Sequence, residues 1–158
     1  MYRGQAKTAY FWVSVILPLL LLLTTVCWVV LRWDALPDAI PLHYDIHGRP
    51  EDWGNKAMIW VMPATGLGIY VLLLVSSFFP QTWKIRGEAA RANPTLAYAA
   101  MAGLIADFRI GATALLCLLT VWGGLSDPGP GWVITAAPLI FLFIPLTRYI
   151  LRLYVLKR

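Results

Sequence analysis

The sequence predicts an all-α membrane protein: a four-helix transmembrane bundle with both termini cytoplasmic and an ordered extracytoplasmic loop between the first two helices. Apolar residues make up 59% of the 158 residues and charged residues only 13%, against roughly 45–50% and about 25% in soluble domains. Four apolar segments reach the roughly 20 residues that a spanning helix needs. The composition therefore excludes both a soluble globular domain and a disordered chain.

The apolar segments give the helix positions. The first follows a basic stretch, as in a signal peptide, but its uncharged core exceeds the roughly 7–15 residues of a signal sequence, so we expect a retained helix. Pro18 should bend this helix slightly. Neither a repeat nor a low-complexity linker divides the chain, so residues 1–158 are expected to form a single integral membrane domain. Its helices are predicted at about residues 9–31, 57–82, 95–124 and 132–153.

Basic residues are distributed unequally on the two sides of the predicted bundle. One side holds only three basic residues, all in the loop at 32–56, and six acids. The other side holds Glu88 and nine basic residues: Arg3, Lys7, Lys84, Arg86, Arg91, Arg148, Arg152, Lys157 and Arg158. Because basic residues stay cytoplasmic, both termini should lie inside and the loop outside, in the cytoplasmic (inner) membrane of a bacterium. The net charge of +5 is then mostly this asymmetry of basic residues. Membrane lipids are expected around the helices, and no nucleic acid partner is expected.

The loop at residues 32–56 carries the most specific pattern of the chain. Apolar and polar residues alternate over residues 40–47, which predicts an extended segment with His43, Asp45 and His47 on one face. Three prolines disfavour helix in this loop. The residues at 48–50, Gly-Arg-Pro, are typical of a turn.

The end of the loop leads into the second predicted helix. Asn55 is suited to cap the start of this helix, because its side-chain oxygen can accept a hydrogen bond from a free backbone N–H. Lys56 is expected to pair with Asp52 at the helix entry. Between the third and fourth helices, Pro128, Gly129 and Pro130 indicate a tight outer turn.

Residues 36–56, LPDAIPLHYDIHGRPEDWGNK, resemble the signature of a family of small bacterial membrane proteins of unknown function. The same domain forms the N-terminal part of SdpI-type toxin-immunity proteins, which protect a cell from its own secreted toxin. The resemblance implies a membrane location and marks the motif as a candidate surface for partner binding. The candidate residues are Pro37, Asp38, Ile40, Pro41, His43, Tyr44, Asp45, Gly48, Asp52, Trp53 and Lys56.

His43, Asp45 and His47 leave a metal site open as an alternative. Three such side chains on one face could hold Zn²⁺, with Asp38 or Asp52 completing the coordination. Otherwise these groups hydrogen-bond the turns of a folded loop. The two cysteines lie inside apolar segments and show no metal-ligand spacing, and no zinc-binding signature occurs. We therefore expect no resident cofactor.

Two charges fall inside the third apolar segment. Asp107 shares one helix face with Ala99, Gly103 and Gly111, and small residues at this spacing indicate close helix packing. Counted from the outer end of each helix at about 1.5 Å per residue, Asp107 and Arg148 lie at a similar depth. We therefore expect an intramembrane ion pair between them, the alternative being a carboxylate in an ion or proton relay.

Arg109 lies two residues after Asp107 in the same segment. This spacing places the two charges about 200° apart around the helix. Arg109 is therefore expected to extend to the inner headgroups rather than into the bundle.

The sequence favours a non-enzymatic function, because it lacks a nucleophile–base constellation, a phosphate-binding loop and a cofactor motif. The expected protein is of immunity type or a sensor, whose outer loop meets a secreted peptide, a toxin or another membrane protein. Two alternatives remain open at this point. One is a small membrane enzyme with a His/Asp metal site in the outer loop, and the other is an accessory subunit of a transporter.

Overall fold

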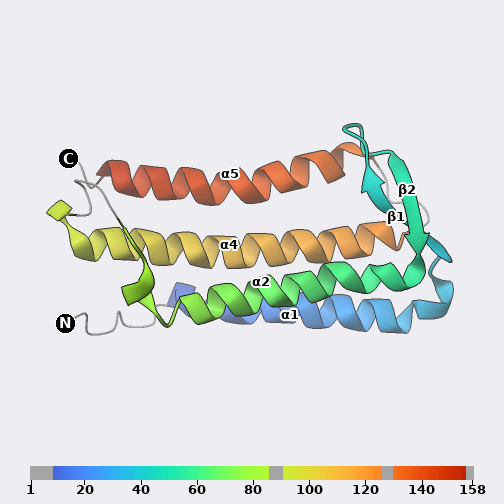
Figure 1. Cartoon of the computed structure of the whole chain (residues 1–158), viewed down its shortest axis with the longest axis horizontal. Coiled ribbons are helices and arrows are strands. Elements are labelled where there is room, and N and C mark those ends of the chain that lie inside the picture. The colour runs from blue at the N-terminus through green and yellow to red at the C-terminus, as the bar shows by residue number, and fades with distance from the viewer. Residues whose placement is uncertain (1–8, 86–90, 126–129, 156–158) are drawn as a thin grey trace.

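The computed structural model describes residues 9–85, 91–125 and 130–155 (Figure 1). Each of its four candidate spans is long and apolar enough to cross a membrane. The chain therefore has the architecture of a multi-pass helical membrane protein, as predicted. The long helices are α1 (Ala9–Leu31), α2 (Val61–Ser76), α4 (Pro94–Gly123) and α5 (Trp132–Val155).

Helix α4 lies at the centre of the bundle. It packs against α1, α2 and α5, and α5 occupies the outer edge beside α4 (Figure 1). Glycines on α4 allow α5 to come close, since Gly103 lies against Arg152 and Gly111 against Phe141. The face predicted from the spacing of Gly103, Asp107 and Gly111 is therefore the face that packs on α5.

Helix α2 ends earlier than the helix predicted at residues 57–82. After α2 the chain turns and forms a short 3-10 helix, η3 (Pro80–Thr82). Pro80 ends the regular helix because proline has no backbone N–H and restricts the residue before it. The predicted span is completed at the other end by a second 3-10 helix, η2 (Lys56–Trp60).

Asn55 caps this entry turn. Its side-chain Oδ1 accepts a hydrogen bond of 2.9 Å from the backbone N–H of Ala57. The predicted cap is confirmed, although the element that it starts is η2 rather than a regular α-helix.

The loop at residues 32–56 contains a β-hairpin, which an all-α fold lacks. A 3-10 turn, η1 (Trp33–Ala35), leads to β1 (Ala39–Tyr44), which pairs antiparallel with β2 (Pro50–Asn55). The predicted extended segment is confirmed only as far as Tyr44, because the chain turns between the two strands. The sequence of β2, PEDWGN, has no alternating apolar residues, so its strand conformation follows from pairing with β1.

The hairpin covers the helix ends at one end of the bundle (Figure 1). Ile40 on its inner face packs into a buried cluster with Val29, Leu36 and Ile59. At the hairpin tip, Gly48 has a φ of +76° and a Cβ there would collide with the backbone of Gly131. Gly48 is thus required for both the turn and the close contact with the start of α5.

The turn predicted between the third and fourth helices falls mostly outside the described residues. Pro128 and Gly129 lie outside them, as does Asp127. The same holds for several of the charges used to predict the orientation: Arg3, Lys7, Arg86, Glu88, Lys157 and Arg158.

Candidate functional site

The turn of the hairpin is closed by Asp45. Its Oδ1 accepts hydrogen bonds from the backbone N–H of His47 at 2.8 Å and of Arg49 at 2.7 Å. The Arg49 N–H, followed by that of His47, holds the pKa of the Asp45 carboxyl below its ordinary value. The carboxylate is therefore directed at the backbone of its own turn.

His43 pairs across the hairpin with Asp52. The distance from His43 Nδ1 to Asp52 Oδ2 is 3.5 Å, and both side chains are exposed. Because β1 ends at Tyr44 and the register is irregular around His43, the expectation that His43, Asp45 and His47 share one face is wrong. Within the described residues, no three histidine, cysteine or acidic side chains form a group that could hold a metal ion.

Lys56 pairs with Asp38 rather than with Asp52. Lys56 Nζ lies 3.5 Å from Asp38 Oδ1, and it also lies 5.3 Å from the ring centre of Trp33. The expected partner is wrong because Asp52 Oδ1 accepts the backbone N–H of Trp53 and its other oxygen faces His43. The Lys56–Asp38 contact joins the start of the hairpin to the entry of α2.

The remaining motif residues divide between the two faces of the hairpin. Ile40 and Tyr44 face the helix ends, and burial raises the pKa of the Tyr44 phenol. Trp53 lies opposite Pro41 in the pairing and is 56% exposed. The inward residues hold the hairpin in place, and the outward ones are available to a partner. Pro37, between η1 and β1, is half-buried.

A shallow, widely open hollow of about 400 Å³ lies beside the hairpin, at the same end of the bundle. Its walls are Val30, Trp33, Asp34 and Trp60. The two indole rings are stacked with centroids 6.2 Å apart, and Asp34 is exposed. The Trp33 ring already faces Trp60 and the Lys56 ammonium group, so the group in the hollow that remains for a cationic ligand is the exposed Asp34 carboxylate beside these rings. This hollow was not predicted from the sequence, although tryptophans near the expected membrane interface, Trp33 among them, could have indicated it.

A second polar site lies at the opposite end of the bundle. The structure brings Asp107 and Arg148 together, with Arg148 Nη1 2.9 Å from Asp107 Oδ1. The hydroxyl of Tyr10 donates a hydrogen bond to the same oxygen. The Arg148 guanidinium also lies 5.6 Å from the centre of the Tyr10 ring. The buried carboxylate thus joins α4 to both α1 and α5.

Arg109 is fully buried, so the expectation that it extends to the headgroups is wrong. Its side chain is 0% exposed and lies 5.6 Å from the centre of the Phe11 ring. Its Nε donates to the backbone carbonyl of Ser14 at 2.7 Å, and Nη2 donates to the Ser14 hydroxyl. Nη1 donates to Ser77 Oγ at 3.2 Å. Arg109 therefore connects α4 to α1 and to the end of α2.

The proline at position 18 explains why Ser14 receives this arginine. In an α-helix the carbonyl of residue 14 accepts the N–H of residue 18, but Pro18 has none. A buried carbonyl left without a donor is costly, and the Arg109 Nε supplies one. Pro18 was the signal in the sequence for this contact, because a proline inside a helix leaves the carbonyl four residues earlier in need of another hydrogen-bond donor.

The fold and these sites define a multi-pass membrane protein with a folded β-hairpin over one end of its helices. The sequence profile of a domain of unknown function, DUF1648, matches residues 19–67. The match runs from the second half of α1 through the hairpin to the start of α2 and includes the whole motif at 36–56. Comparison with curated proteins and with solved structures gives no significant match.

Proposed function

We propose that this chain is a non-enzymatic protein of the bacterial cytoplasmic membrane that receives a secreted cationic, amphipathic peptide at its outer end. The observation that carries this proposal is the hollow lined by Trp33, Trp60 and Asp34. A lysine or arginine side chain of a peptide can lie in it with its apolar stem against the tryptophans and pair its charge with the Asp34 carboxylate. The likeness of the neighbouring motif to SdpI-type immunity proteins favours a peptide that acts on the producing cell.

The charges around the hollow favour a cationic partner. Residues 32–56 contain five acids and three basic residues, which leaves a net charge of −2. Asp38 and Glu51 are exposed beside the hairpin. Trp53 and Ile46, which is 81% exposed, offer apolar surface beside these acids. A peptide with cationic and apolar faces matches both features.

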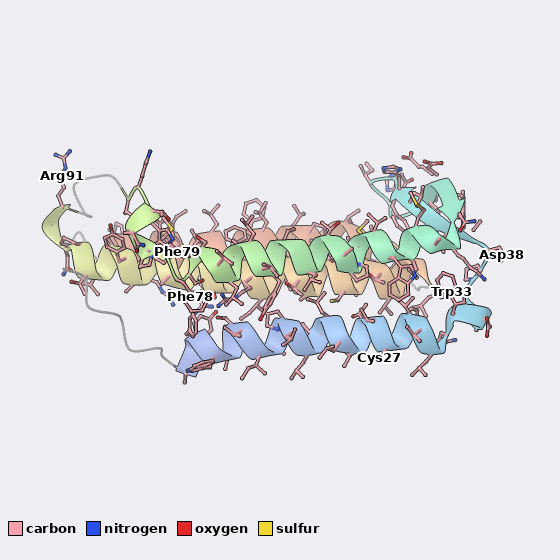
Figure 2. All side chains as sticks on the ribbon, turned by 60° about the horizontal axis from the view of Figure 1, so that its bottom comes forward. Cys27, Trp33, Asp38, Phe78, Phe79 and Arg91 are labelled. Carbon is pink, nitrogen blue, oxygen red and sulfur yellow. The ribbon has the colours of Figure 1, made fainter. Side chains whose placement is uncertain are left out.

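The proposal is tested by photo-crosslinking in living cells of the source bacterium. In one variant, a photoreactive residue replaces Val30, which lines the hollow. In a second variant of the same protein it replaces Phe79, which is exposed at the opposite end of the bundle (Figure 2). A secreted peptide of net positive charge should attach at position 30 and not at position 79. Mass spectrometry of the crosslinked product identifies its size and charge.

Two carboxylate variants make the test specific. Asp34→Asn removes the charge that lines the hollow and should lower the crosslinking yield at position 30 about fivefold or more, as expected for loss of about 1 kcal/mol. Glu51→Gln removes an exposed charge that does not line the hollow and should change the yield much less. Attachment of a large membrane protein, or equal yields at positions 30 and 79, would contradict the peptide proposal.

A further inference from the structure

At the end of the bundle away from the hairpin, α5 carries two arginines one helical turn apart. Arg148 lies against Asp107 of α4. The guanidinium of Arg152 lies against α4 at Gly103, where the Cβ of any larger residue would collide with its Nη1. Both arginines therefore line one seam between α4 and α5, and Gly103 is the notch that admits the second.

Within the part of the chain that the structure describes, one carboxylate, that of Asp107, lies in this seam, and it pairs with Arg148 alone. The side chain of Asp107 is 6% exposed, and the oxygen that Arg148 contacts also accepts the Tyr10 hydroxyl. Among the described residues, no carboxylate lies within ion-pair distance of Arg152. The seam thus holds two positive charges and one negative charge, and the unpaired cation is half-buried.

The seam that holds the two arginines is open to the surroundings of the bundle, since Arg152 is partly exposed and Arg148 more so. The side chain of Arg148 is 45% exposed although one of its nitrogens contacts Asp107. On the same side of α5, Ile144 and Leu151 are apolar and exposed, about one helical turn before and after Arg148. A ligand that binds here therefore meets guanidinium donors at one point and an apolar helix surface beside it.

We propose that the α4–α5 seam binds the phosphate group of an anionic phospholipid, with Arg148 and Arg152 as donors. Guanidinium forks match the oxygens of a phosphate and form charge-assisted hydrogen bonds with them. The seam lies near the end of the predicted spans, where phosphate headgroups are present, and the acyl chains of the lipid lie along Leu151 and Ile144. Basic sites between membrane helices bind anionic headgroups in this way.

The test uses the full-length protein purified in a neutral detergent. Native mass spectrometry measures retention of phosphatidylglycerol and, in a parallel sample, of phosphatidylcholine. We expect phosphatidylglycerol to be retained in preference. Arg152→Gln should weaken its retention about fivefold, which corresponds to roughly 1 kcal/mol for one basic residue at an anionic surface. Arg32→Gln, at the hairpin end where Arg32 lies over Trp28, is the matched control and should retain the lipid.

Two further variants separate the binding site from a purely structural role. Gly103→Ala keeps both charges but displaces the Arg152 guanidinium from its notch, and it should weaken retention as Arg152→Gln does. Arg152→Lys keeps the positive charge but lacks the planar guanidinium group. It replaces Arg152→Gln in the experiment if that variant does not fold, and we expect it to lower lipid retention to an intermediate level. Equal retention of both lipids, or unchanged retention in Arg152→Gln, overturns the proposal and leaves Arg152 as a cation that offsets the helix dipole.

Inorganic phosphate distinguishes a lipid headgroup from a free anion. It is added to the detergent-solubilised protein at the same molar excess as the lipid, and thermal unfolding is followed. We expect stabilisation by phosphatidylglycerol and none by phosphate alone, because the acyl chains contribute to binding along α5. An equal shift with inorganic phosphate overturns the lipid assignment.

Discussion

At the scale of single residues, spacing along the chain predicted one polar contact within the helices, that of Asp107 with Arg148, and missed another, that of Arg109 with Ser14. Arg109 is buried because Pro18, far away in sequence, leaves the Ser14 carbonyl without its helical donor. Asp107 was placed on the correct face by the pattern of small residues on its own helix. The face of Asp107 follows from residue spacing on a single helix and could be predicted. The Arg109 contact could not, because it requires knowing which helix packs against the carbonyl that Pro18 leaves free.

The link between Pro18 and Arg109 predicts a coupling in unfolding free energy. Arg109→Met should destabilise the protein by about 1–3 kcal/mol, because it leaves the Ser14 carbonyl buried without a donor. In a Pro18→Ala background the backbone N–H of the introduced alanine can serve that carbonyl, so the same substitution should cost less. A double-mutant cycle measured by unfolding in detergent gives the difference.

Pro138→Ala is the control background for this cycle, because Pro138 lies inside α5, a helix to which Arg109 makes none of its described hydrogen bonds. There the cost of Arg109→Met should equal its cost in the unmodified protein. An equal cost in the Pro18→Ala background as well would show that the freed carbonyl does not explain the position of Arg109.

At the scale of elements, the helices were predictable and the hairpin was predictable only in part. The four long apolar segments set the helix positions to within a few residues, except where Pro80 ends α2 early. In the hairpin, β1 shows alternation up to Tyr44, but β2 is mostly exposed and polar. Its conformation is fixed by backbone pairing and by the contact of the tip with α5, and neither leaves a pattern in the sequence.

Gly48 allows a direct test of how the hairpin is attached. Gly48→Ala places a side chain at a φ of +76° and against the Gly131 backbone, so it should detach the tip and destabilise it by about 1–2 kcal/mol or more. Amide hydrogen exchange of residues 45–50 should become faster while exchange in α4 stays slow. Gly68→Ala is the control, because a Cβ there meets open space and alanine favours a helix. Unchanged exchange at the tip in Gly48→Ala would contradict this attachment.

At the scale of the whole molecule, the acids of the described residues, apart from the buried Asp107, all lie at the hairpin end of the bundle. Arg91 lies with Phe78 and Phe79 at one end, and Trp33 and Asp38 lie at the other (Figure 2). The acids that surround the proposed peptide site are all at the hairpin end. The arginines of the proposed lipid site are at the opposite end, so the two proposals place their ligands on opposite sides of a membrane.

This separation makes the orientation of the bundle a testable property. Because basic residues are retained on the cytoplasmic side, we expect the hairpin outside and the α2–α4 connection inside. Cys27 and Cys117 are first replaced by alanine, and single cysteines are then introduced by Arg49→Cys and Lys84→Cys, both at exposed positions. A membrane-impermeant maleimide should label position 49 in intact cells and leave position 84 unlabelled.

Permeabilised cells provide the control, since both cysteines should then react if both are accessible to water. Labelling of position 84 and protection of position 49 in intact cells would show that the bundle has the opposite orientation in the membrane. The hollow beside Trp33 and Asp34 would then face the cytoplasm, where a secreted peptide cannot reach it, and the α4–α5 seam would meet outer-leaflet headgroups instead. The labelling experiment therefore decides whether the proposed peptide site is on the side of the membrane where its ligand occurs, independently of whether either ligand binds.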